Sequence, residues 1–192
     1  MNFKSVRGTF KSFQQLLITM ENLQRKQSTL LMGVDGCGGS GKSTFAKETS
    51  ELSNEITIIH MDDFYLPSNS RINDTPEEKP IGADFDWQRL RKQVLMPLAN
   101  NEEGNYQRYD WCSDSLSEWH RVSVGGIVII EGVYSTRKEL AGFYDFKIFV
   151  DCPRELRLRR GIEREGESGK DIWEKVWMVE EDKYMIEHRP SE

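Results

Sequence analysis

The chain has 192 residues, of which 37% are hydrophobic and 30% are charged, with a formal net charge of −6 at pH 7. This length fits one domain with a substantial core, and the acidic balance argues against nucleic acid as a main partner. No apolar run approaches the roughly 20 residues of a membrane span, and no signal peptide is evident at the start, so we expect no membrane association. The three cysteines lack C-x-x-C spacing, which indicates neither a disulfide framework nor a zinc site and favours the cytoplasm.

Residues 1–28 are expected to form a helical lead-in to a single domain spanning residues 29–192. Apolar side chains recur there at helical spacing: Phe10, Phe13, Leu16, Leu17, Met20 and Leu23. We expect this segment to pack on the outside of the core and to contribute no chemistry.

The apolar run 29–35 predicts the first strand, and a G-x-x-x-x-G-K-S pattern, the Walker A P-loop, follows it directly. Glycines allow positive φ and bring backbone N–H groups close to phosphate oxygens, and a helix from Lys42 to about Leu52 adds the positive end of its dipole. Lys42 is predicted to contact the β- and γ-phosphates, and the Ser43 hydroxyl to bind Mg²⁺. The predicted nucleotide-binding residues are Gly36, Cys37, Gly38, Gly39, Ser40, Gly41, Lys42 and Ser43.

The rest of the chain alternates predicted strands with predicted helices. Strands are expected at 55–60, 126–131 and 146–151, and helices at 87–98, 153–165 and 171–188. Residues 66–83 are expected to form a loop, and the polar, aromatic segment 100–123 to be weakly structured and to lie over the site. This alternation predicts an α/β fold, a P-loop NTPase-type doubly wound parallel sheet with helices on both faces.

Carboxylates at the expected strand ends are the first candidates for chemistry, because ligands of such sheets lie beyond the carboxyl ends of the strands. Asp62 is placed to act as a base towards an acceptor hydroxyl, although Asp62-Asp63 is also compatible with a turn or a helix cap. Glu131 ends an apolar strand where an unpaired charge would be costly, which favours a role near Mg²⁺, a salt bridge to Lys42 or another cation, or both.

Three arginines share one face of the helix that Pro153 begins: Arg157, Arg160 and Arg164. Such a face is able to clamp phosphates as a lid, and it is equally compatible with an ordinary solvated surface. The chain contains no N-K-x-D guanine-reading motif and no L-S-G-G transporter signature.

In combination, these motifs resemble the uridine kinase, phosphoribulokinase and pantothenate kinase family of P-loop kinases. The resemblance spans residues 29–188 and rests on G-C-G-G-S-G-K-S-T at 36–44, which adds Thr44 to the nucleotide-binding set, and on four further segments. These are H-M-D-D-F-Y at 60–65, Y-D-W-C-S-D-S at 109–115, V-I-I-E-G at 128–132 and D-C-P-R-E-L-R-L-R-R at 151–160. The resemblance implies ATP- and Mg²⁺-dependent phosphorylation of a hydroxyl on a small molecule.

The resemblance also implies roles for single residues. Asp62 resembles the family's catalytic base, and Tyr65 resembles an aromatic residue of the substrate pocket. Ser43 and Glu131 resemble the residues on the metal side. The expected catalytic residues are Asp62, Lys42, Arg160 and Arg164. The expected substrate-binding residues are Asp62, Tyr65, Tyr109 and Asp114.

Several positions depart from the family pattern. Asp114 stands where uridine kinases carry a pyrimidine-reading His, and residues 79–86 do not reproduce the N-F-D-H-P-type stretch that supplies the ribose-binding Asp. These departures weigh against uridine itself, since unpaired polar groups discriminate strongly between substrates. The lid segment 165–170 is poorer in arginine than is usual, and the chain ends at Glu192, where family members usually add a strand, so we expect one open sheet edge.

The sequence is therefore compatible with three functional classes. The favoured one is a uridine kinase-like small-molecule kinase whose acceptor is nucleoside-like, with pantothenate- or sugar-type acceptors as alternatives. A nucleotide-binding regulator would keep Lys42 and Ser43 without needing an acceptor base, and a degenerate family member would have a structural role. The expected partner is a small molecule, and the sequence leaves room for a homo-oligomer.

Overall fold

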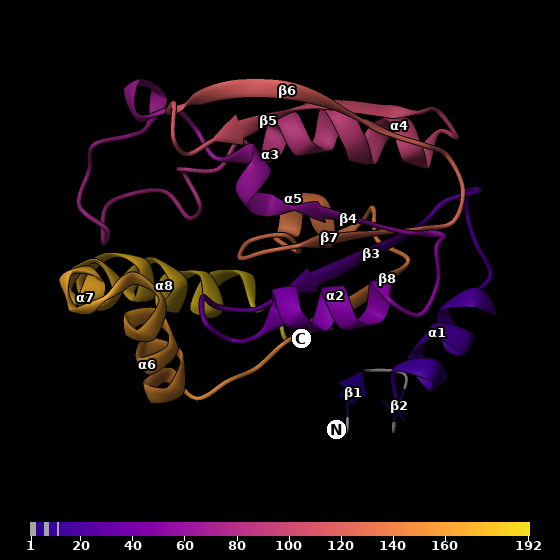
Figure 1. Ribbon diagram of the computed structural model, residues 1–192, viewed down its shortest axis with the longest axis horizontal. Helices are drawn as coiled ribbons and strands as arrows, with labels where there is room; N and C mark the ends of the chain where they lie inside the picture. The colour runs from indigo at the N-terminus through magenta and orange to yellow at the C-terminus, as the bar shows by residue number, and fades with distance from the viewer. Residues whose placement is uncertain (1–2, 6–7, 11) are drawn as a thin grey trace.

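The computed structural model describes residues 3–5, 8–10 and 12–192 and contains a central four-stranded parallel sheet (Figure 1). The order of strands across the sheet is β4-β7-β3-β8. Their bounds are β3 (Leu30–Asp35), β4 (Ile56–His60), β7 (Ile127–Glu131) and β8 (Phe146–Phe149). Helices cover both faces of the sheet, which confirms the predicted doubly wound α/β fold.

Alternating side chains of the strands form two separate cores, because successive residues of a strand point to opposite faces. On one face, Leu30 and Met32 pack with α1 (Phe13–Glu21) and α2 (Lys42–Ser50). On the other, Leu31 packs against the helix expected at 87–98. That helix consists of α3 (Trp87–Leu90), the π-helical turn η3 (Arg91–Leu95) and α4 (Met96–Ala99).

The N-terminal segment differs from the predicted helical lead-in. Strands β1 (Phe3–Ser5) and β2 (Gly8–Phe10) pair antiparallel, so the helix prediction is wrong there and right only for α1. Residues 1–2, 6–7 and 11 of the predicted lead-in lie outside the described residues. The helix begins late because Ser12 is extended and caps it, its hydroxyl accepting from the Gln15 N–H at 3.2 Å.

The lead-in was also expected to lie outside the core, and this is wrong for α1. Leu16 and Met20 are 0% exposed and belong to the core under α2. The short helix α1 thus covers part of one face of the sheet together with α2.

Residues 100–123 were expected to be weakly structured, and this prediction is wrong. They form an antiparallel hairpin of β5 (Gly104–Asp110) and β6 (Ser115–Val122), at the top of Figure 1 beside α3 and α4. Only a few of its side chains, Tyr106 and Val122 among them, enter the core. Most of β6 is exposed, and the pairing shifts register between Gln107 and Tyr109, so the apolar alternation that signals a strand is faint in the sequence.

The C-terminal helices gather beside the carboxyl ends of the strands, at lower left in Figure 1. They are α6 (Arg154–Glu165), the 3₁₀ turn η4 (Glu167–Gly169), α7 (Lys170–Ile172), the π-helical turn η5 (Trp173–Trp177) and α8 (Met178–His188). The remaining short elements are η1 (Met61–Phe64), η2 (Ser68–Ser70) and α5 (Lys138–Ala141). Among the described helices, none has the length and apolar character needed to cross a membrane.

Trp173 is the contact that joins these helices. Its side chain is 1% exposed and lies between Gly161 of α6 and Gly38 of the P-loop. A Cβ at Gly161 would lie 2.3 Å from the indole ring, and one at Gly38 would lie 2.9 Å from it. Glycine at both positions therefore lets a tryptophan reach the loop.

We expect Gly161→Ala to lower the free energy of unfolding by about 1–3 kcal/mol, because the new methyl group overlaps the Trp173 ring. Urea denaturation measures the change. Gly142→Ala is the matched control: a Cβ there meets nothing within 4 Å and its backbone is already helical, so that substitution should be neutral or slightly stabilising. Equal stability of the two variants would contradict the packing argument.

Candidate active site

The P-loop connects β3 to α2, as the sequence predicts. Gly39 and Gly41 have φ of +73° and +101°, a region that favours glycine. Lys42 begins α2 and its Nζ lies 3.4 Å from the carbonyl oxygen of Cys37. The Cys37 thiol is buried, which raises its pKa to about 12. The Ser40 hydroxyl is buried and has no hydrogen-bond partner within the described chain. These features fit a loop whose backbone receives phosphate oxygens.

Ser43, in the first turn of α2, lies next to Glu131, the last residue of β7. Both residues were predicted to lie on the metal side of the site. The Ser43 hydroxyl is 3.1 Å from each carboxylate oxygen of Glu131, and that side chain is 5% exposed. Nδ1 of His60 lies 2.5 Å from Glu131 Oε1, and this hydrogen bond is the largest cause that raises the His60 pKa. A hydroxyl and a carboxylate are the oxygen donors that Mg²⁺ prefers, so the pair fits that ion.

The adjacent residues Asp62 and Asp63 have different surroundings. Asp62 lines a cavity together with Lys42 and Glu131. It stays open to solvent through the cavity, but the protein around it displaces part of its hydration. That burial, ahead of the opposing effect of Lys42, raises the pKa of its carboxyl group. Asp63 instead accepts a hydrogen bond from the Tyr106 hydroxyl at 2.9 Å, so it ties η1 to the hairpin.

Asp35 anchors the start of the P-loop from below. It is 0% exposed, and its carboxylate accepts from the Gly36 N–H at 2.7 Å, from the N–H and hydroxyl of Thr136 at 2.8 Å each, and from the Tyr184 hydroxyl at 2.6 Å. Burial raises the pKa of Asp35, and these donors oppose that shift. The loop is thereby joined to the segment after β7 and to α8.

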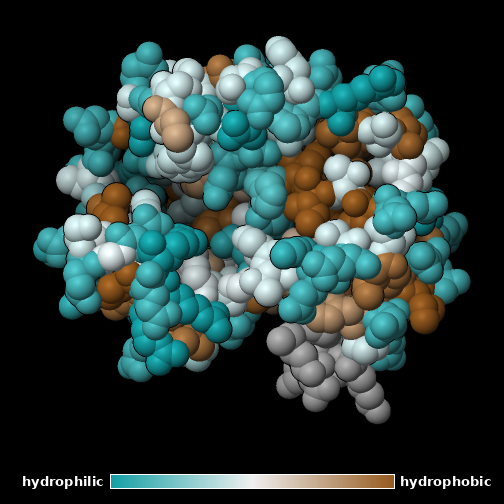
Figure 2. Space-filling model, in the orientation of Figure 1, coloured by the Kyte–Doolittle hydropathy of each residue, from teal (hydrophilic) through white to brown (hydrophobic). Residues whose placement is uncertain are grey.

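The cavity that contains Asp62 has a volume of about 460 Å³ and extends away from the P-loop between the hairpin and the C-terminal helices. Figure 2 shows a hollow between these two parts of the surface. Its walls carry aromatic side chains and carboxylates: Tyr65, Phe85, Trp111, Tyr134, Trp173, Trp177, Asp84, Glu165, Glu180 and Glu181. Tyr65 and Trp111 have ring centroids 4.6 Å apart and line it together.

Tyr109 and Asp114, expected to contact the substrate, lie behind this wall. The Tyr109 hydroxyl donates to Asp114 at 2.6 Å, and Asp114 also accepts from the backbone N–H and the hydroxyl of Ser68. Neither residue lines the cavity. Their positions join the hairpin to the 66–83 loop and support Trp111 and Tyr65, while direct contact with a substrate stays a prediction.

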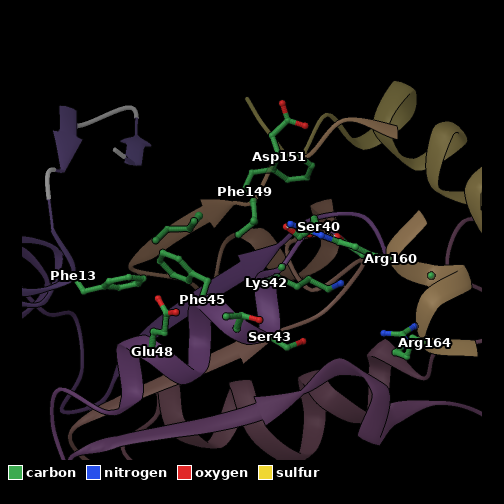
Figure 3. Close-up of a pocket in the computed structure, with 16 residues that line it drawn as sticks. Phe13, Ser40, Lys42, Ser43, Phe45, Glu48, Phe149, Asp151, Arg160 and Arg164 are labelled. Atoms are coloured by element: carbon green, nitrogen blue, oxygen red, sulfur yellow. Dashed lines mark hydrogen bonds between the residues drawn. The ribbon is translucent and has the colours of Figure 1, made fainter. Parts of the chain in front are cut away.

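The three arginines of α6 divide between the interior and the site. Arg157 is buried and donates to Glu181 at 2.7 Å. Arg160 donates to the carbonyl oxygen of Gly39 at 3.0 Å, and Arg164 lies over the Trp173 ring at 5.6 Å. Figure 3 shows Arg160 and Arg164 on the same side of the P-loop as Lys42.

Glu181 is the site residue that sequence reasoning missed. Its Oε1 accepts from the Gly38 N–H at 2.6 Å while its other oxygen pairs with Arg157, so α8 holds both the loop and α6. Burial raises the pKa of Glu181, and the Gly38 N–H opposes this most strongly. A signal was present, since Glu181 falls four residues after Trp177 and eight after Trp173, on the apolar stripe of its helix.

A family model described as the phosphoribulokinase/uridine kinase family matches residues 31–185. The chain belongs to this family. Among similar proteins of the family is the uridine kinase of Ureaplasma parvum serovar 3, 28% identical over 158 residues, covering 78% of this chain and 75% of that protein. The nicotinamide riboside kinase of Saccharomyces cerevisiae is 28% identical over 166 residues, covering 73% of this chain and 67% of the relative.

Solved structures share the fold of this family member. A structure described as a possible uridine kinase from Bacillus stearothermophilus superposes with a TM-score of 0.72 at 24% identity, covering 93% of this chain and 92% of the other. The family match begins in β3, so it includes the P-loop, Asp62, Glu131 and Glu181 but not α1.

We expect Arg157→Ala to lower the free energy of unfolding by about 3–5 kcal/mol, because it leaves Glu181 buried without its charged partner. Urea denaturation measures this loss. Arg159→Ala on the same helix is the control: that side chain is 70% exposed and its pair with Glu163 is long, so the change should stay within about 0.5 kcal/mol. A small effect of Arg157→Ala would show that the buried pair does not hold α6 to α8.

Proposed function

We propose that this family member is a cytoplasmic, ATP- and Mg²⁺-dependent kinase that phosphorylates a hydroxyl of a nucleoside-like small molecule. The observation that carries the proposal is the position of Asp62. It lies in one cavity with Lys42 and with the Ser43–Glu131 pair, and the same cavity continues into a chamber of aromatic rings and carboxylates. The proposed base and the phosphate-binding lysine thus line the same cavity as the proposed acceptor site.

The proposed reaction uses these residues in a single displacement. Asp62 accepts the proton of the acceptor hydroxyl, whose oxygen forms a bond to the γ-phosphorus while the bond from that phosphorus to the β–γ bridging oxygen breaks. Lys42 and the P-loop N–H groups hold the phosphates and stabilise the charge that passes to the leaving diphosphate. Ser43 and Glu131 would hold Mg²⁺, which supplies further charge neutralisation when bound. Arg160 and Arg164 are proposed to complete the charge around the phosphates.

The far end of the chamber supports an acceptor with several hydrogen-bond donors. Asp84 Oδ1 is buried without a hydrogen-bond partner within the described chain, and Glu180 Oε1 has only a long ion pair with Lys79 at 3.7 Å, the same lysine that pairs with Asp84 Oδ2. Buried acceptors of this kind need donors, which the hydroxyl groups of a sugar supply. Tyr65 and Trp111 provide flat apolar surface for a ring next to those hydroxyls. Sugar and ring together describe a nucleoside-like compound.

The test is release of ADP from Mg·ATP in the presence of single acceptors: uridine, cytidine, nicotinamide riboside, pantothenate and free sugars. We expect acceptor-dependent ADP with a riboside and little with pantothenate, which lacks the sugar. Turnover only with pantothenate or a free sugar would show that the acceptor is not nucleoside-like. Slow ADP release that is independent of every acceptor would favour a nucleotide-binding regulator instead.

For the base, we expect Asp62→Asn to lower the rate of transfer about 10²-fold or more while ATP binding is largely retained, because an amide cannot accept the proton. Lys42→Ala should weaken both ATP binding and transfer. Steady-state kinetics and calorimetric ATP titration separate the two effects.

Asp63→Asn is the matched control, since this neighbour faces Tyr106 rather than the cavity and should keep the rate within a few-fold. The parent's kcat/KM should fall as pH decreases through a pKa above the ordinary aspartate value, because burial raises the pKa of Asp62 in the free protein and only the carboxylate is a base. Unchanged transfer in Asp62→Asn would remove Asp62 from this role.

A further inference from the structure

A second cavity, of about 880 Å³, lies along the outer side of the P-loop and α2. At one end it is lined by loop residues including Lys42 and by Arg160; at the other it is lined by Phe13 and Phe45 (Figure 3). The cavity thus has one end rich in phosphate-binding groups and one end with aromatic walls. This polarity matches the two parts of a nucleoside triphosphate.

Phe13 is held in place by the core beneath it. It is the first residue of α1, directly after the Ser12 cap, and its ring centroid lies 5.3 Å from that of Phe45 at an interplanar angle of 45°. Leu16, one turn later, is 0% exposed and fixes the helix on the sheet. Phe13 itself is half-buried, so one part of its ring packs and the rest borders the cavity. The aromatic wall is therefore preformed.

The direction of a bound triphosphate follows from the two ends. With the terminal phosphates at Lys42, the nucleoside must leave the loop along the cavity, past Thr44 and towards the aromatic end. Aromatic side chains stack on the face of any base, so such a wall does not depend on which base is bound. Glu48 lines the aromatic end of the same cavity and offers an acceptor to the amino group of a base. Figure 3 shows Glu48 next to Phe45 on α2.

On the proposed function, we infer that Phe13, with Phe45, forms the wall against which the base of the triphosphate donor packs. Phe13 precedes the family match at residues 31–185 and Phe45 lies within it, so the N-terminal segment contributes one side of this wall. Phe13 is thereby a residue that sets affinity for the donor nucleotide and has no part in binding the acceptor, whose chamber lies on the other side of Lys42.

The experiment compares binding of Mg·ATP and of Mg-bound inorganic tripolyphosphate to the full chain by calorimetry. Tripolyphosphate has the phosphates and no base. We expect Phe13→Ala to weaken ATP binding roughly tenfold and to leave tripolyphosphate binding unchanged, because only ATP loses a stacking contact. Phe13→Tyr should retain ATP affinity. Ile18→Ala is the control on the same helix, 58% exposed and outside the cavity, and should change neither affinity.

Phe13→Leu keeps most of the packing volume against Phe45 and provides a second variant if the alanine variant does not fold. It should also lose ATP affinity selectively. Equal weakening of both ligands, or no weakening of ATP in either variant, would overturn the inference while leaving the proposed kinase intact. A parent protein that binds neither ligand would overturn the proposed function and this inference with it.

Discussion

The rest of the site depends on the hydrogen bonds that the buried Asp35 carboxylate accepts. A carboxylate with no solvent exposure is costly unless its oxygens are fully hydrogen-bonded, and here donors arrive from Gly36, Thr136 and Tyr184. These donors belong to the P-loop, to the segment after β7 and to α8. The buried carboxylate therefore links the start of the loop to the docked C-terminal helix.

A second carboxylate repeats this arrangement on the upper side of the loop. Glu181 accepts from the Gly38 N–H and pairs with Arg157, while Trp173 packs on the same glycine. The loop is therefore held between Asp35 and Glu181, both of which contact α8 or belong to it. Asp35 and Glu181 thus position the loop backbone without belonging to the groups proposed to bind phosphate. Arg160 is proposed for both tasks, because it also donates to the carbonyl oxygen of Gly39 at 3.0 Å.

The hairpin and the N-terminal helix show where pattern reading fails. β6 exposes most of its residues, so its alternation has little apolar content. The hairpin is fixed instead by Tyr106 and Val122, which share a core with the sheet. In the N-terminal segment, the apolar spacing typical of a helix begins at Phe10. The structure instead places Phe10 in strand β2, and the helix begins only after Ser12. The hairpin is set by its contacts with the sheet core, whereas in the N-terminal segment local strand pairing and the Ser12 cap outweigh the apolar spacing.

What the residues determine by themselves is local: the P-loop, the strands and helices around it, and an aspartate and a glutamate at the ends of β4 and β7. These could be predicted because each depends on neighbours within a few positions along the chain, where residue type and spacing are sufficient. The order of strands across the sheet, the pairing of Glu181 with Gly38, the contact of Asp114 with Ser68 and the place of Phe13 beside Phe45 were decided only in three dimensions. Each joins residues far apart in the chain, and packing of the helices against the sheet is what brings them together.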